Sequence, residues 1–182
     1  MELLAKGKRG KVYLEGNYVV KRADETRIKN EVFWLKKLNN KGIGPKLISF
    51  GEDWFKAEYV EGKLIEDYLS ECSKENAAKL LKDCLKQCRS MDRLKVNKKE
   101  MHHPVKHILI TTDGARMIDF ERCRKTLDPK NVTQFCQFLT SGSFAYGLEN
   151  KGLIINKRIL KFAQKYKHDP SRKNFDAILE EI

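Results

Sequence analysis

The chain has 182 residues, of which 41% are hydrophobic and 34% charged, and its formal net charge is +12. This apolar fraction is spread evenly along the chain, so it predicts a packed core and excludes an intrinsically disordered protein. The length suits one domain, or two small lobes that share a cleft.

No apolar run approaches the roughly 20 residues that a membrane-spanning helix needs. The N-terminal stretch MELLAKGKRG lacks the long apolar segment and the small-residue cleavage site of a signal peptide. We therefore expect a cytoplasmic protein that makes no membrane contact.

The five cysteines include no Cys-x-x-Cys pair. An odd number without such a pair argues against a disulfide framework and against a ribbon-type zinc site. Cys84 and Cys88 stand one helical turn apart in LLKDCLKQC, which favours two positions in the core of a helix.

The positive charge predicts attraction to polyanions such as nucleic acid, nucleotide phosphates or acidic proteins. Lysines are distributed over most of the chain and alternate with Glu and Ile. A solvated surface explains most of this charge. A basic face that binds RNA or a ribonucleoprotein is the alternative, and such binding would weaken steeply with salt.

The first fifty residues predict strands followed by a helix. KVYLEGNYVVKRA contains two β-prone runs, at 12–14 and 18–20, joined by a Glu-Gly-Asn turn, and so predicts a hairpin. In the next segment apolar residues recur at spacings of three and four: Ile28, Val32, Leu35 and Leu38. This spacing predicts an amphipathic helix that ends at Asn-Asn-Lys-Gly.

The remainder predicts fewer strands and more helices. PKLISFGEDWFKAEYVEGK has strand character, residues 63 to about 94 have a helical pattern, and HILITTDGARMIDF predicts a second hairpin. After Pro129 we expect only helices, in NVTQFCQFLTSGSFAYGL, NKRILKFAQKYKH and SRKNFDAILEEI. The pattern predicts a single α+β domain with a β-rich N-lobe (1–61) and a reduced, mainly helical C-lobe (62–182).

A basic turn near the N-terminus is the first candidate for binding. AKGKRGKVY places Gly7 and Gly10 between two expected antiparallel strands, where backbone N–H groups can approach a phosphate closely. Four basic residues add positive charge to this turn: Lys6, Lys8, Arg9 and Lys11. By itself, a pair of glycines in a basic loop usually forms only a turn.

Lys21 ends the apolar run YVVK, where its ammonium is expected to point inward. Burial of an ammonium is unfavourable unless an acid or a phosphate pairs with it. Glu31 follows on the next predicted helix, on or near its apolar face. A Lys–Glu pair beneath a glycine turn is the arrangement with which kinases bind the α- and β-phosphates of ATP.

Asp119 in MIDFER directly follows two apolar strand residues, where a metal-binding carboxylate is expected. The alternative is a surface aspartate in a turn. Met117, Ile118 and Phe120 around it favour burial instead.

With these residues in this order, the chain resembles the protein-kinase-like superfamily. The resemblance is strongest to its small atypical branch: RIO-type kinases, the small kinase of the tRNA-modifying KEOPS assembly, and predicted archaeal serine/threonine kinases of minimal length. It runs from about residue 3 to residue 122, and its motifs are Gly7/Gly10, Lys21, Glu31, HILI and IDF.

The resemblance implies a two-lobed fold and an ATP site. Gly7, Gly10, Lys21 and Glu31 would contact the phosphates, and Asp119 would bind Mg²⁺ or Mn²⁺. The backbone of the connector between the lobes would hydrogen-bond the adenine edge, at Glu58, Tyr59 and Val60.

The catalytic loop departs from the kinase pattern. Alignment on ILI places His102 where kinases carry the catalytic Asp and His107 where they carry a metal-binding Asn. A neutral imidazole accepts a proton near pH 7, so His102 is chemically admissible as the base, with Glu100 or His103 as alternatives if the loop is shifted. His107 suits Mn²⁺ better than Mg²⁺, which prefers oxygen, so we expect one bound metal ion rather than two.

The three clustered histidines, His102, His103 and His107, also allow other interpretations. A structural zinc site needs about four soft ligands, and no Cys stands at a suitable spacing. A loop histidine bonded to a backbone carbonyl, with the others exposed, is the second alternative. Glu121 further replaces the glycine that follows Asp-Phe in kinases.

About a dozen residues separate Asp119 from the helix predicted to start at KNVTQF, so the chain lacks a long activation segment. RIO-type kinases are similarly short, which implies that the phosphoacceptor is a specific protein partner or the protein itself. We expect a serine/threonine protein kinase. The alternatives are a nucleotide-binding pseudokinase that acts as a switch or scaffold, and a basic RNA- or ribosome-associated module on a kinase fold.

Overall fold

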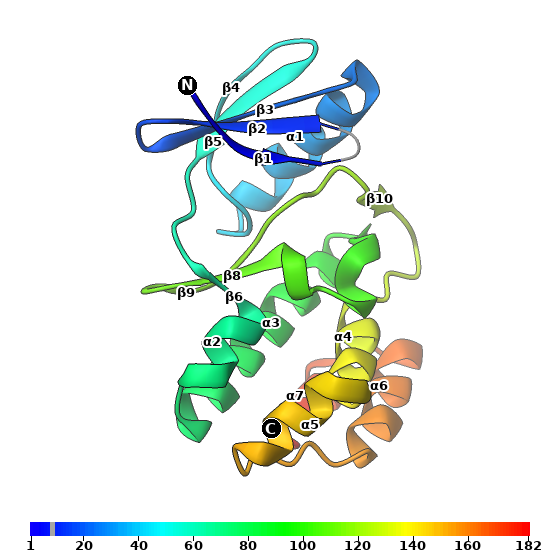
Figure 1. Ribbon diagram of the computed structural model, residues 1–182. Coiled ribbons are helices and arrows are strands. Elements are labelled where there is room, and N and C mark those ends of the chain that lie inside the picture. Colours follow the sequence, from blue (N-terminus) through cyan, green and yellow to red (C-terminus); the bar gives the residue numbers. More distant parts are fainter. Residues whose placement is uncertain (8–9) are drawn as a thin grey trace.

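A computed structural model describes residues 1–7 and 10–182 of the chain and has an α+β architecture (Figure 1). The N-terminal part is a five-stranded antiparallel sheet in the order β1-β2-β3-β5-β4. Its strands are β1 (Glu2–Lys6), β2 (Gly10–Glu15), β3 (Tyr18–Ala23), β4 (Leu47–Phe50) and β5 (Trp54–Glu58). The hairpin predicted in KVYLEGNYVVKRA is confirmed as β2–β3, and Gly16 at its turn has a φ of 59°.

Helix α1 (Glu25–Asn39) packs on this sheet (Figure 1). Asp24 precedes it, and its Oδ1 accepts the Arg27 backbone N–H at 3.1 Å, which satisfies one of the free donors of the first turn. The predicted apolar stripe is buried: Ile28, Val32, Leu35 and Leu38. Glu31 lies on the same buried face, so this helix brings a carboxylate into the core.

The C-terminal part is mainly helical and lies at the other end of the molecule (Figure 1). Its short strands β6, β8 and β9 lie on the side that is nearer the five-stranded sheet. Its helices are α2 (Ile65–Glu71), α3 (Lys74–Arg93), α4 (Asn131–Leu139), α5 (Gly142–Asn150), α6 (Arg158–His168) and α7 (Arg172–Leu179). Its strands are β6 (Lys63–Leu64), β7 (Val96–Asn97), β8 (Ile108–Thr111), β9 (Gly114–Met117) and β10 (Arg124–Lys125). Two 3₁₀ turns, η1 (Lys99–His102) and η2 (Val105–His107), form the histidine-rich loop.

The second predicted hairpin is confirmed as β8–β9, which β6 extends to a three-stranded sheet. Strand β10 pairs with β7, so the chain that leaves Asp119 returns alongside the start of the histidine-rich loop. The residues 61–62, where the lobe boundary was predicted, lie in the connector between β5 and β6.

The helical pattern over 63–94 is divided in the structure. β6 and α2 come first, and α3 begins only after Ser73, whose hydroxyl accepts the Asn76 N–H at 3.2 Å. NVTQFCQFLTSGSFAYGL likewise forms two helices, because α4 ends at Leu139 and α5 begins at Gly142. Thr140 and Ser141 donate their hydroxyls back to carbonyls of the preceding turn, a local bonding mode that competes with helix continuation.

The core runs along α3. Cys84 and Cys88 are fully buried in it, as their spacing predicted, and burial raises the pKa of both thiols. All five cysteines are free thiols. Within the described ranges, no helix has both the length and the apolar character needed to cross a membrane.

Candidate active site

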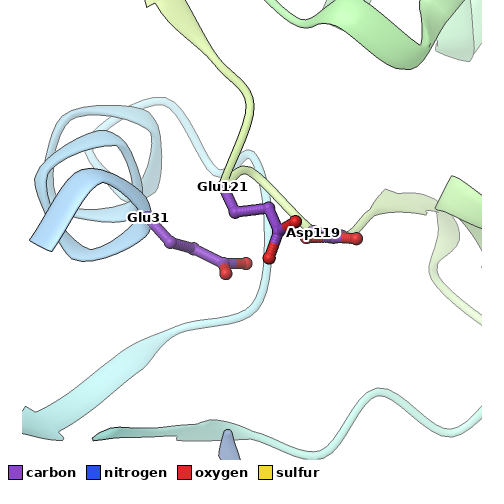
Figure 2. A group of neighbouring side chains, drawn as sticks. All are labelled: Glu31, Asp119 and Glu121. Carbon is purple, nitrogen blue, oxygen red and sulfur yellow. The ribbon is translucent and has the colours of Figure 1, made fainter. Parts of the chain in front are cut away.

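Four charged side chains from three parts of the chain meet on one face of the sheet, at its central strand β3. Lys21 Nζ in β3 lies 2.7 Å from Glu31 Oε2 in α1 and 2.9 Å from Asp119 Oδ1. It also lies 3.3 Å from Glu121 Oε2. Figure 2 shows Glu31 extending from α1 toward Glu121, with Asp119 beside Glu121 on the segment after β9.

Local structure explains why these side chains converge. Val19 and Lys21 are two residues apart in β3, so both leave the same face of the sheet, and both line one cavity. Glu31 lies on the buried face of α1. Asp119 follows β9 with a φ of 61°, a left-handed conformation that is unfavourable for a residue with a Cβ and tends to occur at functional sites.

The carboxylates keep Lys21 charged despite its burial. Burial alone lowers the pKa of a lysine, but the attraction of Glu31 and then Asp119 outweighs it and raises the pKa of Lys21 above its ordinary value. Burial raises the pKa of Glu31, against the attraction of Lys21. Asp119 is half-buried, which by itself would raise its pKa, yet Lys21 holds that pKa below the ordinary value.

Glu121 is a site residue that the sequence did not identify as one. Its side chain is 11% exposed and pairs with Lys21 and with Arg27, whose guanidinium lies 3.2 Å from Oε1. The only signal in the sequence was an acidic residue directly after Ile-Asp-Phe. One oxygen each from Glu31, Asp119 and Glu121 lies within 4.8 Å of the others, and such hard oxygen donors fit Mg²⁺ or Mn²⁺.

An apolar cavity of about 240 Å³ opens beside this cluster. It is lined from the sheet by Val12, Val19 and Phe55 and from the C-terminal part by Leu109 and Ile118. The volume is just below the range of about 300–1,000 Å³ typical of small-molecule sites, so a drug-sized ligand would fill it and extend past its mouth. Lys21, Glu31 and Asp119 line the cavity too, which places charge at one side of an apolar chamber.

The connector predicted to bind adenine also lines the cavity, through Glu58, Tyr59 and Val60. Two of its backbone amides already have partners within the protein. The Glu58 N–H donates to the Lys46 carbonyl at 2.9 Å, and the Tyr59 N–H donates to the Asn17 carbonyl at 3.0 Å. The Val60 N–H has no backbone acceptor in the part of the chain that the structure describes, so it is the amide of the three that is left for a ligand.

The glycine turn is described only in part, because Lys8 and Arg9 lie outside the described residues. The Gly7 N–H donates to the Gly10 carbonyl at 3.0 Å, so the two predicted glycines close the turn. A Cβ on Gly10 would lie 2.6 Å from the Arg22 carbonyl oxygen, which is why only glycine fits there. Of the described residues, Leu4 and Val12 near this turn line the cavity, and Gly7 and Gly10 do not.

The three clustered histidines are placed in different surroundings. His107 Nδ1 lies 3.8 Å from Asp119 Oδ2 and is buried without a hydrogen-bond partner among the described residues. Burial, and then the charge of Lys98, lowers the pKa of His107, so its imidazole is neutral at pH 7. His103 packs edge-on against Phe138, with the ring centroids 5.9 Å apart.

His102 is exposed, and its Nδ1 lies 2.8 Å from the Lys99 carbonyl oxygen. A carbonyl only accepts, so Nδ1 carries the hydrogen and Nε2 carries the lone pair of the neutral ring. Within the described ranges no hydrogen bond or ion pair joins His102 to Lys21 or Asp119. The histidines therefore do not gather around a common point, as a zinc site would require.

Glu100, the alternative base, is withdrawn from solvent. It is 6% exposed, and its carboxylate lies 3.4 Å from Lys98 Nζ and 3.5 Å from Arg122 Nη1. Two cations thus occupy this carboxylate. Of the three candidate bases, His102 and His103 are exposed and Glu100 is not.

Known proteins add little to this geometry. No family model matches the chain. The chain is 29% identical to the uncharacterized protein MJ1211 of the archaeon Methanocaldococcus jannaschii over 114 residues, which cover 60% of this chain and 97% of that protein. The name of that protein states no activity, so the function must be argued from the site.

Proposed function

We propose that the protein is a small, atypical serine/threonine protein kinase that binds ATP with Mg²⁺ or Mn²⁺. The proposal includes a two-lobed protein-kinase-like fold of the RIO-like, minimal archaeal type. The observation that carries it is the Lys21–Glu31 ion pair at 2.7 Å, which lies with Asp119 at the charged side of an apolar cavity. Apolar walls suit a nucleoside base, and a positioned ammonium suits its phosphates.

In this proposal each residue of the cavity has a separate task. Val12, Val19 and Leu109 would enclose the base, and the free Val60 N–H would donate to its edge. Lys21 would exchange a carboxylate partner for a phosphate oxygen, while Glu31 keeps it oriented. Asp119, with Glu121 beside it, would hold the metal ion, which would neutralise phosphate charge.

The proton of the acceptor hydroxyl would be taken by His102. Its Nδ1–H would donate to the Lys99 carbonyl, which leaves Nε2 of the neutral ring as the atom that accepts the proton. Its exposure would allow a protein acceptor to reach it. The segment between Asp119 and α4 contains only the short β10, which favours a specific partner or the protein itself as acceptor over many different peptides.

A second candidate function is nucleotide binding without phosphoryl transfer, as a switch or scaffold. It is favoured by the loss of both usual catalytic-loop residues, since His102 and His107 replace them. It is also favoured by the lack of a contact between His102 and Asp119 within the described ranges. The cavity and the Lys21 cluster would serve both candidates equally.

ATP binding and autophosphorylation, each measured with Mg²⁺ and with Mn²⁺, test both candidates. We expect wild type to bind ATP, Lys21→Ala and Asp119→Asn to weaken binding, and His102→Ala to bind within threefold of wild type. His102→Ala should lower transfer at least about 100-fold, the usual contribution of a general base. His168→Ala, which alters an exposed histidine in α6 outside the loop, is the matched control and should change neither ATP binding nor transfer.

Three results are informative in different ways. Transfer that is lost in His102→Ala supports the kinase. Binding without detectable transfer in wild type supports the switch. Absence of ATP binding in wild type with either metal ion would contradict both candidates.

A further inference from the structure

Lys98 is a fully buried lysine at the start of the histidine-rich loop, with no exposed side-chain surface. Burial of an ammonium is strongly unfavourable without compensating partners. Its backbone is held firmly, because its N–H donates at 2.8 Å to Asn131 Oδ1. Asn131 is held in turn by Asp92, whose Oδ1 accepts its Nδ2 at 2.7 Å. The side chain of Lys98 therefore starts from a fixed point beside α4.

The ammonium of Lys98 is directed at the segment that carries Asp119. It donates to the carbonyl oxygen of Ile118 at 2.9 Å and to the carbonyl oxygen of Asp119. Its third partner is Glu100, at the longer distance of 3.4 Å. An ammonium has three hydrogens, and two of them serve two consecutive carbonyls of one short segment.

That segment requires support from outside. Asp119 has a φ of 61°, which is unfavourable for a non-glycine residue by about 1–3 kcal/mol. The Phe120 N–H donates to Glu31 Oε1 at 3.0 Å on the side of α1. Lys98 bonds the two preceding carbonyls, and its ammonium lies 4.8 Å from the centre of the Phe120 ring.

We infer that Lys98 is the positioning residue for Asp119: its ammonium fixes the left-handed backbone that turns the Asp119 carboxylate toward Lys21 and the cavity. Lys98 touches neither the cavity nor Lys21, so it acts only through this backbone. The effect of Lys98 on the binding of metal-bound nucleotide rests on the proposed function. The effect of Lys98 on the backbone of Asp119 does not depend on that function.

The backbone effect is tested by amide hydrogen exchange of Lys98→Met, which keeps the length of the side chain and removes the ammonium. We expect the Phe120 amide to exchange at least tenfold faster than in wild type, while the Leu85 amide in the centre of α3 is unchanged. Lys99→Met, an exposed neighbour, is the matched control and should change neither. Unchanged Phe120 exchange, or equal acceleration at Leu85, overturns the inference.

A second test uses the conformational freedom of glycine. If Lys98 holds a left-handed residue in place, Asp119→Gly should relieve the need for it, and Asp119→Ala should not, although both remove the carboxylate. We expect Lys98→Met to lower the urea midpoint at least twice as much in the Asp119→Ala background as in the Asp119→Gly background. Should Lys98→Met alone fail to fold, Asp119→Gly and not Asp119→Ala should restore folding. Equal behaviour of the two backgrounds overturns the inference.

A third measurement connects Lys98 to the proposed function. In Lys98→Met the gain in ATP affinity that Mn²⁺ provides should fall about tenfold, whereas ATP binding without metal should stay within threefold of wild type. An equal fall in both contradicts a positioning role. A wild type that binds no ATP contradicts the proposed function instead, and the exchange and urea experiments then still decide the role of Lys98.

Discussion

Two Lys–Glu pairs, Lys21–Glu31 and Lys98–Glu100, contact the segment that carries Asp119, and they differ in what surrounds the lysine. Lys21 Nζ is 2.7 Å from Glu31, its side chain is 14% exposed, and its other ionic partners are also carboxylates. Lys98 Nζ is 3.4 Å from Glu100, is closed to solvent, and has backbone carbonyls as its nearer partners. The same two residue types thus form one pair that opens to a cavity and one that fixes the backbone.

The difference shows which lysine is free to bind a ligand. Around Lys21, three carboxylates face two cations, Lys21 and Arg27, so the open cluster carries excess negative charge that suits a divalent cation. Around Lys98 the two nearer partners are backbone carbonyls, and exchanging them for a ligand would leave buried carbonyls unpaired. We therefore expect substitutions in the two pairs to differ in size and in the property they affect.

The largest effect is expected for Lys21→Met. It leaves Glu31, which is 3% exposed, without a cation and leaves Asp119 with a weaker partner. The free energy of unfolding should therefore fall by about 3–5 kcal/mol near pH 7. The loss should shrink below about pH 4, because protonation removes the unpaired charges. Urea unfolding at several pH values measures this, with Lys99→Met as control. A loss that is equal at pH 4 and pH 7 would show that charge is not its cause.

The next effect concerns a buried carboxylate that has no cation at salt-bridge distance within the described residues. Asp92 accepts the Asn131 N–H at 3.0 Å and the Val132 N–H at 3.3 Å, and burial raises its pKa from 3.8 to about 6. The folded state therefore binds this proton more tightly than the unfolded state, and the group favours folding most below pH 4. This contribution is lost as pH rises through 6, and the change corresponds to about 3 kcal/mol.

Asp92→Asn removes that titration. The stability of wild type relative to Asp92→Asn should fall by about 3 kcal/mol between pH 4 and pH 7, as followed by urea unfolding at fixed ionic strength. Asp113→Asn, an exposed change, should show no such trend. A difference that is constant with pH, or that grows as pH rises, would rule out the raised pKa of Asp92.

Glu31→Gln should change the stability less than Lys21→Met or Asp92→Asn does. The amide oxygen can still accept the Phe120 N–H, but an NH₂ group then faces the Lys21 ammonium, so we expect a loss of about 2 kcal/mol. ATP affinity should fall at least tenfold, because Lys21 is no longer oriented. Glu25→Gln, which alters an exposed pair on the same helix, is the control. Lost ATP affinity without lost stability would mean that Glu31 contacts the ligand directly.

The Lys21–Glu31 pair, which opens to the cavity, was predictable from the sequence. The Lys98–Glu100 pair, which is closed to solvent, was not. Lys21, Glu31 and Asp119 each stand at a recognisable local place: the end of an apolar run, the buried face of a helix and the end of a hairpin. Lys98 and Glu121 stand in no such pattern. Their direction depends on the left-handed turn at Asp119 and on contacts with residues far away along the chain, which local periodicity does not report.

The same limit applies to the fold and to the catalytic loop. The hairpins and the helices α1 and α3 followed from their apolar spacing, because packing and pattern agree there. The break between α4 and α5 comes from hydroxyl groups that bond back to the preceding turn, and the sequence pattern continued across it. The roles of His102 and His107 were predicted from alignment alone, and the structure places only His107 beside Asp119.

The smallest expected effect, for Glu100→Gln, is the sharpest test of the comparison. Glu100 is buried next to Lys98, so a simple account of buried ion pairs predicts a loss of 3–5 kcal/mol, as for Lys21→Met. We expect only about 1 kcal/mol, because both ionic contacts of Glu100 are long, at 3.4 Å to Lys98 and 3.5 Å to Arg122, and both backbone carbonyls remain bonded to Lys98. ATP affinity should stay within threefold of wild type. Urea unfolding and ATP binding, with Glu25→Gln as control, measure both. If the free energy of unfolding falls as much as in Lys21→Met, the ionic bond between Lys98 and Glu100 contributes more to stability than the bonds from Lys98 to the backbone carbonyls.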